Sequence, residues 1–382
     1  MTGAGPIPPG REARPHGHPP QPRGRESVAA GETGGSPAGP FTADPASAAD
    51  RRTRVRLLAA LLHARGQSVS GAELAARLGI SRTAIWKHVE ALRQDGMPVD
   101  ARPRRGYSLA PEDLDRAAAV RFFPELLEAE RLGRRLGHTV HWVPEAGSTN
   151  DLARRMAETG AAEGTVVIAD RQTAGRGRMR RFWWSPPGGL WMSVVLRPRL
   201  LPAQLPVLTL AVAVAVAEAM EIVAGRPVGL KWPNDVEVDG RKVAGILLEM
   251  AGQPDGTEYV IAGIGVNLDV RDEPVPEELR DRVTWLAREA ERPMTRNRLA
   301  ATILDRLERH YDGLHRTGPD AVLGAWRARA TILGERVRVI LPTEEVAGVA
   351  IDVDRDGALL VEVPGDGRRR VLAGDVQRVR PL

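Results

Sequence analysis

The stretch TAGRGRMRRFWWSPPGGLW, residues 173–191, holds four arginines within positions 175–181 and then three tryptophans. A hydrophobic core cannot hold so many guanidinium groups, and a solvated surface has little use for so many indole rings. The flanking segments GTVVIAD (164–170) and GLWMSVVLRP (189–198) have the apolar character of buried strands. We therefore expect a flexible basic loop between two strands, with arginine forks suited to a phosphate. A solvated basic hairpin is the alternative.

The loop does not match the common nucleotide-binding motifs. Arg180 stands where a dinucleotide fingerprint would have its third glycine, and the segment leads into a strand instead of a helix. The Gly-Lys-Ser/Thr ending of a Walker loop is also missing. A Rossmann or P-loop site is therefore excluded.

From about residue 138 to 330, strands and helices alternate around this loop. The segment VEVDGRKVAGILLEM (236–250) predicts a hairpin with an Asp-Gly turn, and YVIAGIGVNL (259–268) predicts another buried strand. The apolar run LTLAVAVAVA (208–217) closes at Glu218, which makes it short for a membrane span, and it predicts a buried, alanine-rich helix. Beyond residue 333, short strands separated by turn residues predict a small β-barrel of SH3-like size.

Residues 52–110 have the pattern of a small helical unit. Ser70 and Gly79 are placed to begin and end one helix. After a short turn, the apolar residues of a second helix recur on one face, at Ile85, Val89 and Leu92. The segment PVDARPRRGYSL then predicts a two-stranded wing. Together these elements predict a winged helix-turn-helix.

The residues expected to face DNA lie on the second helix and on the wing. Polar, basic and aromatic side chains occupy the first turns of the helix, away from its apolar face, at Ser81, Arg82, Thr83, Trp86 and Lys87. Arg104 and Arg105 stand at the wing tip, where they can reach phosphates. Residues 51–110 carry twelve Arg or Lys against four Asp or Glu, a net of +8, whereas the whole chain is +5. A solvated helix face in a protein-contact domain is the alternative.

The chain has no cysteine, which excludes disulfides, thiolate nucleophiles and cysteine-ligated zinc. Residues 1–50 are rich in Pro, Gly and Ala, without an apolar segment of the secretory type, and are predicted to be disordered. These features favour a cytoplasmic location.

Lysine is rare, since only Lys87, Lys231 and Lys242 occur among 54 basic residues. KWPNDV (231–236) combines an ammonium for a phosphate, a carboxylate at Asp235 for Mg²⁺ and an aromatic wall at Trp232, although it is also a turn signature. Lys242 lies in an otherwise apolar segment, so its ammonium needs a partner or a ligand unless it is exposed at a strand end.

Two further motifs contain small residues. In GIGVN (263–267), glycines stand where a ligand or another backbone must come close. GSTND (147–151) is by itself typical of an ordinary helix N-cap.

Taken in order, these motifs resemble those of the bifunctional bacterial biotin protein ligases, which also repress the biotin operon. The shared motifs are STN (148–150), QTAGRGR (172–178), KWPND (231–235), RKVAGIL (241–247) and GIGVN (263–267). The resemblance covers residues 52 to 382. It implies an α+β multidomain protein with a class II synthetase-like central sheet. The expected domains are a tail (1–50), a winged helix-turn-helix (51–112), a mixed α/β ligase domain (113–332) and an SH3-like barrel (333–382).

The resemblance also implies roles for individual residues. Expected biotin contacts are Ser148, Thr149, Asn150, Gln172, Arg176, Gly177, Arg178, Lys242 and Gly245, with Arg178 and Lys242 catalytic. Expected ATP contacts are Arg181, Lys231, Asn234, Asn267 and Trp285, the last packing on adenine, with Asp235 holding Mg²⁺. One departure is Arg180, where the family loop usually has glycine, which would stiffen the loop or add a phosphate contact.

The implied reaction joins biotin to ATP as biotinyl-5′-AMP and then to a lysine of a biotin carboxyl carrier protein. The implied further partners are operator DNA and a second copy of the chain, in a homodimer promoted by biotinyl-AMP. Two rival hypotheses stay open. One is a lipoate–protein ligase, which is related in fold and reaction. The other is a transcriptional regulator that senses a small molecule without turnover.

Overall fold

The computed structural model describes residues 45–131, 133–253, 256–270, 273–290, 294–341 and 343–379. Residues 1–44 of the predicted disordered tail (1–50) lie outside the described residues. For residues 45–50 the prediction of disorder is wrong, because helix α1 already begins at Pro45.

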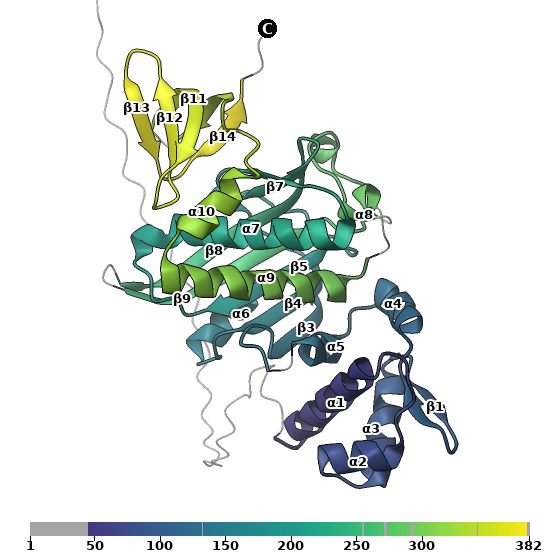
Figure 1. Ribbon diagram of the computed structural model, residues 1–382. Helices are drawn as coiled ribbons and strands as arrows, with labels where there is room; N and C mark the ends of the chain where they lie inside the picture. The colour runs from purple at the N-terminus through teal and green to yellow at the C-terminus, as the bar shows by residue number, and fades with distance from the viewer. Residues whose placement is uncertain are drawn as a thin grey trace, which may run out of the picture. The chain divides into compact units, whose positions relative to one another are not determined.

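The first elements form the predicted helix-turn-helix and wing (Figure 1). Ser70 caps α2 by accepting a hydrogen bond from the backbone N–H of Glu73, and Gly79 ends the helix in the left-handed conformation, with φ of 72°. The apolar face of α3 is buried, as predicted. The elements are α1 (Pro45–His63), α2 (Gly71–Leu78), α3 (Arg82–Gln94), β1 (Asp100–Arg102) and β2 (Gly106–Ser108).

Two short helices, α4 (Pro111–Val120) and α5 (Pro124–Glu130), follow the wing. The boundary predicted between residues 112 and 113 therefore falls inside a helix. On α5, Leu126 packs in the core of the winged helix and Leu127 in the core of the central sheet. This helix thus belongs to both hydrophobic cores.

A seven-stranded sheet forms the centre, in the order β3-β4-β5-β9-β8-β7-β6. Only β3 and β4 are parallel, and the other neighbours are antiparallel. The predicted hairpin is β7–β8, and Asp239 and Gly240 both have positive φ at its turn. The strands are β3 (Thr139–Ala146), β4 (Thr165–Gln172), β5 (Leu190–Leu196), β6 (Gly229–Lys231), β7 (Asp235–Val238), β8 (Arg241–Gln253) and β9 (Gly256–Val266).

Helices α7 (Leu205–Ala224) and α9 (Arg296–Thr317) run side by side across one face of this sheet (Figure 1). Among the described residues, α7 with its preceding turn is the one helix long and apolar enough to cross a membrane, but 78% of that apolar window is buried inside the protein. Its composition is therefore accounted for by the core.

The buried helix predicted from the apolar run is confirmed, and it continues beyond the end of that run at Glu218 as far as Ala224. Glu218 pairs with His310 of α9 at 3.1 Å, and Glu221 pairs with Arg329 at 2.7 Å. Since both carboxylates have partners, they do not terminate the helix.

The last strands form a five-stranded antiparallel sheet in the order β13-β12-β11-β10-β14. No pairing joins its edge strands β13 and β14 within the described residues, so the structure has a small open sheet where a closed barrel was expected. Its strands are β10 (Arg336–Ile340), β11 (Glu345–Val353), β12 (Leu359–Val363), β13 (Gly367–Val371) and β14 (Asp375–Arg378), preceded by α10 (Asp320–Arg327).

Candidate active site

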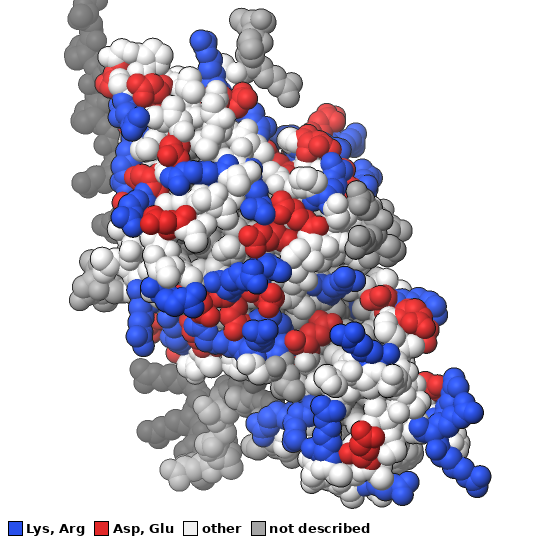
Figure 2. Space-filling view, in the orientation of Figure 1, with Lys and Arg blue, Asp and Glu red and all other residues white. Residues whose placement is uncertain are grey.

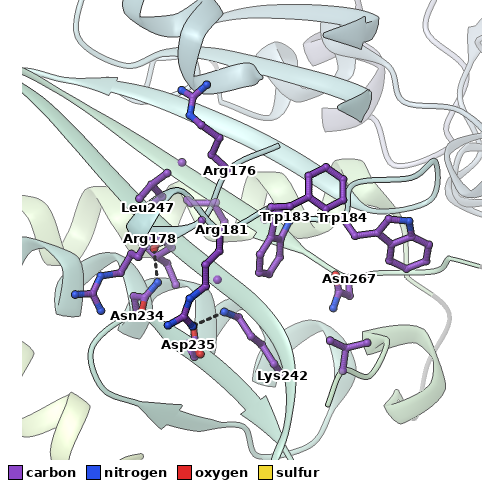
Figure 3. Close-up of a pocket in the computed structure, with 18 of the residues that line it drawn as sticks. Arg176, Arg178, Arg181, Trp183, Trp184, Asn234, Asp235, Lys242, Leu247 and Asn267 are labelled. Atoms are coloured by element: carbon purple, nitrogen blue, oxygen red, sulfur yellow. Dashed lines mark hydrogen bonds and ion pairs between the residues drawn. The ribbon is translucent and has the colours of Figure 1, made fainter. Parts of the chain in front are cut away.

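One cavity of about 490 Å³ brings the sequence-predicted ligand residues together (Figure 3). Its volume lies in the range of small-molecule sites. All ligand-site residues predicted for the catalytic domain line it except Trp285: Ser148, Thr149, Asn150, Gln172, Arg176, Gly177, Arg178, Arg181, Lys231, Asn234, Asp235, Lys242, Gly245 and Asn267. They come from the end of β4, the start of α6 (Thr149–Glu158), the arginine loop, the β6–β7 turn, β8 and the end of β9.

Small polar groups line one end of the cavity. The backbone N–H and the hydroxyl of Thr149 donate to Gln172 Oε1 at 2.8 and 3.1 Å. The Ser193 hydroxyl lies 2.7 Å from Thr149 Oγ1 and 2.6 Å from Asn150 Oδ1. Ser148 is the N-cap residue of α6, as the sequence predicted, but its side chain makes no capping hydrogen bond. These groups form a fixed polar wall, suited to a neutral ligand with donors and acceptors.

Lys242 also lines the cavity and has the predicted partner. Its Nζ lies 2.5 Å from Asp235 Oδ1 and 4.9 Å from the centre of the Trp183 ring. Figure 3 shows the ion pair between the two strands of the β7–β8 hairpin. An ammonium held between a carboxylate and an indole face is well placed to receive an incoming anion.

The other residues of the KWPND segment have different environments. Lys231 Nζ lies 3.9 Å from Glu237 Oε1, and the Asn234 amide donates to the backbone carbonyl of Ile246 at 2.8 Å. Trp232 does not form the expected aromatic wall, since it is 1% exposed and donates its indole N–H to Gly357 O. A buried indole that satisfies its donor is a core residue.

The arginine loop is a hairpin with a pinned stem. The Trp183 N–H donates to Gly175 O at 2.9 Å, and the Gly177 N–H donates to Arg181 O at 2.8 Å. The Arg176 guanidinium contacts Asp151 and points away from Asp235 and Lys242 (Figure 3). Arg178 and Arg181, nearer the tip, lie instead on the side of Asn234, Asp235 and Lys242 (Figure 3).

Two arginines of the tip reach the C-terminal sheet. Arg178 Nη1 donates to Gly374 O at 3.1 Å, and Arg181 Nη2 lies 2.9 Å from Asp375 Oδ2. Burial lowers the pKa of Arg178 below its ordinary value. Burial alone would raise the pKa of Asp375, but the hydrogen bond and charge of Arg181, together with the charges of Lys231 and Arg178, leave that pKa lowered. The cavity therefore includes residues of two domains, which the sequence did not indicate.

Met179 and Arg180 adopt positive φ values of 55° and 57° at the tip. This conformation favours glycine, which explains the glycine that the resemblance leads one to expect at position 180. Arg180 is exposed and does not line the cavity, so it makes no contribution there among the described residues.

Trp183 is a lining residue to which sequence reasoning gave no role, although the run of tryptophans marked the segment. Its ring covers two glycines: a Cβ atom on Gly245 would lie 3.0 Å from the ring, and one on Gly265 would lie 2.7 Å from its Nε1. Similarly, a Cβ on Gly263 would lie 2.3 Å from Asn150 Oδ1. The close approach predicted for these glycines is therefore made by side chains of the protein itself.

Trp285, predicted to pack on adenine, is buried behind the cavity wall. It packs with Val283 and Trp184, which do line the cavity. The Arg288 guanidinium lies 4.8 Å from its ring centre. In this structure Trp285 supports the wall and does not face the ligand.

The residues predicted to face DNA are all exposed: Ser81, Arg82, Thr83, Trp86, Lys87, Arg104 and Arg105. Trp86 is 54% exposed, which is an unusually high exposure for a large aromatic side chain. Figure 2 shows basic side chains over the wing and the helices near it, with few acidic ones between them. A winged helix with such a face, joined to a cavity for a small anionic ligand, defines a DNA-binding protein with a catalytic domain.

Comparison with known proteins agrees with this definition. A family model described as the biotin/lipoate A/B protein ligase family matches residues 143–267. An HTH domain model matches residues 54–108, and a biotin protein ligase C-terminal domain model matches residues 332–379.

The chain is 37% identical over 327 residues to the bifunctional ligase/repressor BirA of Bacillus subtilis, which covers 85% of this chain and 98% of that protein. It is 34% identical over 319 residues to the protein of the same name from Escherichia coli. That match covers 83% of this chain and 94% of the Escherichia coli protein. A biotin protein ligase of Aquifex aeolicus, solved in complex with biotin and ATP, is 30% identical with a TM-score of 0.55, covering 64% of this chain and 99% of that one. The chain belongs to the family of bifunctional biotin protein ligases and repressors.

Proposed function

We propose that the protein activates biotin with ATP to give biotinyl-5′-AMP and pyrophosphate. It then transfers the biotinyl group to a lysine of a biotin carboxyl carrier protein. The observation that carries the proposal is the convergence of a polar wall, Lys242 and the arginine loop in one cavity. The wall suits the neutral ureido ring, and the cations suit a carboxylate and a phosphate. The family membership supports the same reaction.

The ureido ring of biotin has both donors and acceptors, which the polar wall can satisfy. We assign its contacts to Ser148, Thr149, Asn150 and Gln172. The side chains of the last three are already oriented by one another and by Ser193. A pocket oriented before binding loses little entropy when the ligand enters. We also assign Gly245 to the biotin site, because its missing side chain leaves room for the Trp183 ring and the Lys242 chain there.

The adenylation step needs positive charge where the carboxylate attacks the α-phosphate of ATP. We assign this to Lys242 and Arg178, which would stabilise the charge that develops on the phosphate. Lys242 exchanges its present partner, Asp235, for the biotin carboxylate. Lys231, Asn234, Arg181 and Asn267 are assigned to the nucleotide. Trp285 acts in this assignment only by supporting the wall behind Val283.

The second step is attack of the acceptor lysine amine on the acyl carbonyl, with AMP as the leaving group. The mixed anhydride must be protected from water until the acceptor arrives. The tip of the arginine loop, bound to Gly374 and Asp375, is placed to cover it. Exposed Met179 and Phe182 on the same tip would exclude water from the entrance.

Mg²⁺ is assigned to the nucleotide site, where it neutralises phosphate charge. The described residues contain no group of three His, Cys, Asp or Glu side chains that could hold a metal by themselves. Asp235 offers one carboxylate beside the cations, which fits an ion held mostly by substrate phosphates.

For the DNA-binding domain we propose biotin-responsive repression of genes for biotin synthesis or transport. The recognition residues are Ser81, Arg82, Thr83, Trp86 and Lys87, with Arg104 and Arg105 on phosphates. A homodimer that forms when biotinyl-5′-AMP is bound would present two such units to an operator with two half-sites. We also propose a cytoplasmic location, because ATP and the proposed acceptor and operator would be met there. We also propose that the C-terminal sheet is an SH3-like unit and that the central sheet is of the class II synthetase type.

A biotin-dependent ATP–pyrophosphate exchange assay tests the enzymatic proposal. Exchange that requires biotin supports adenylation, and exchange that requires lipoate would instead make the protein a lipoate–protein ligase. Tight biotin binding without any exchange would make it a catalytically silent regulator.

A further inference from the structure

Two carboxylates, Asp151 and Glu249, lie just behind the cavity without lining it. Asp151 is on the first turn of α6, and Glu249 is on β8. The Arg176 guanidinium lies between them. Its two terminal nitrogens donate to the two oxygens of Asp151 at 2.6 and 2.7 Å, and Nη2 lies 3.5 Å from Glu249 Oε1. Such a bidentate pair fixes orientation more strictly than a single contact.

Arg154, one turn along α6, completes this cluster. Its Nη2 donates to Asp151 Oδ1 at 2.8 Å and lies 3.5 Å from Glu249. Two carboxylates thus face two guanidinium groups. These four side chains are 30–39% exposed, so the cluster contributes little to global stability. Its effect is expected to be on the placement of the groups that it holds.

Glu249 also holds a residue of the polar wall. Its Oε2 accepts a hydrogen bond from Asn150 Nδ2 at 2.7 Å. With that amide nitrogen directed to Glu249, Asn150 Oδ1 faces the hydroxyl of Ser193 and packs against the Cα of Gly263. The orientation of Asn150 in the cavity therefore depends on Glu249.

The opposite side of the loop stem is tied to the same wall. Gln172 Nε2 donates to Ser185 Oγ at 2.9 Å, and the Ser185 hydroxyl donates to Trp183 O at 3.0 Å. Gln172 in turn accepts from Thr149. A continuous set of hydrogen bonds thus joins the polar wall to both strands of the stem.

We propose that Glu249 and Asp151 are positioning residues that hold the arginine loop over the cavity before any substrate binds. Glu249 orients both Asn150 and Arg176, whereas Asp151 orients Arg176 but makes no hydrogen bond to Asn150 among the described residues. The inference rests on the proposed function, since it assigns Asn150 to biotin and the loop to the adenylate. It predicts different effects for the two carboxylates, which a general loss of stability would not produce.

Glu249→Gln and Asp151→Asn are the test variants, because both keep the size of the side chain and remove its charge. In Asp151→Asn we expect biotinyl-5′-AMP to dissociate about tenfold faster, with the KM for biotin unchanged. In Glu249→Gln we expect the same faster release and, in addition, a KM for biotin raised about three- to tenfold. The kcat of pyrophosphate exchange at saturating biotin should stay within about twofold, because neither side chain touches the reacting atoms.

Glu344→Gln is the matched control, because Glu344 is an exposed carboxylate paired with Arg369 on the C-terminal sheet. It should leave both constants unchanged. Melting temperature, with and without biotin, identifies a variant that is merely unstable. If Glu249→Gln proves unstable, Asp151→Asn alone decides whether the cluster holds the loop.

Wild-type retention of biotinyl-5′-AMP in Asp151→Asn, or parallel changes in all three variants, would overturn the positioning role. Either result leaves biotin-dependent exchange by the wild-type protein intact. Failure of the wild-type protein to exchange pyrophosphate would instead reject the proposed function itself, so the two failures are distinguishable.

Discussion

Replacing Lys242 by alanine removes the ammonium that lies between Asp235 and the Trp183 ring. Truncating one partner of a buried charge pair costs about 2–5 kcal/mol. Since the Lys242 and Asp235 side chains are 27% and 23% exposed, solvent screening places the cost near the lower end, at about 2–3 kcal/mol. Each 1.4 kcal/mol, roughly, is a factor of ten in rate. We therefore expect kcat/KM for biotin to fall by about 30- to 160-fold.

The assay is biotin-dependent pyrophosphate exchange at saturating ATP with biotin varied. Lys87→Ala is the matched control, because Lys87 is the one lysine of the chain outside the cavity and is exposed on α3. It should leave exchange unchanged. Exchange by Lys242→Ala within about twofold of the wild-type rate would refute the assignment of Lys242 to the reacting carboxylate.

Four further outcomes are expected. Arg178→Gly loses the contact with Gly374, so biotinyl-5′-AMP should dissociate at least about tenfold faster. The released adenylate should then label lysines of bystander proteins. Unchanged retention of biotinyl-5′-AMP would contradict this prediction. Arg180 adopts a left-handed backbone conformation, which costs a non-glycine residue about 1 kcal/mol, and Arg180→Gly removes this cost. The greater entropy of the unfolded glycine chain offsets part of the gain, so the melting temperature should stay level or rise slightly. A clear fall would show that the side chain is stabilising. Because the pKa of Asp375 is lowered in the folded protein, its attachment to Arg181 is complete above the ordinary Asp pKa of about 4 and is lost as the pH falls further. Adenylate retention that already declines near pH 6 would point to another group. Arg104→Ala should reduce the slope of log affinity for operator DNA against log salt by about 1, and an unchanged slope would remove that residue from the phosphate contacts.

The local elements could be predicted from the sequence because their signals are short-range. The cap of α2 and the Asp-Gly turn of the β7–β8 hairpin depend on adjacent residues and were found correctly. The partners of Glu218 and Glu221 could not be predicted, because they lie far along the chain at His310 and Arg329. Sequence reasoning counts a charge as exposed unless its partner is known.

The candidate site likewise has features that the sequence predicts and others that depend on long-range contacts. The motif order identified the lining residues, but not how they are held. The contact of Arg176 with Asp151 and that of Arg181 with Asp375 join segments that no periodicity connects. Trp232 and Trp183 were equally prominent in the sequence, yet one is a core residue and the other covers the cavity floor. Only the folded structure distinguishes two such indole rings.

The scarcity of lysine has a practical consequence for chemical labelling. Lys231 and Lys242 line the cavity, both near carboxylates, and Lys87 is exposed on the recognition helix. An amine-selective reagent therefore meets one lysine side chain outside the cavity, and two partly exposed ones inside it. A fluorophore on Lys87 lies on the face assigned to DNA. Ligand binding should protect Lys231 and Lys242 from the same reagent, so these two lysines report the occupancy of the cavity.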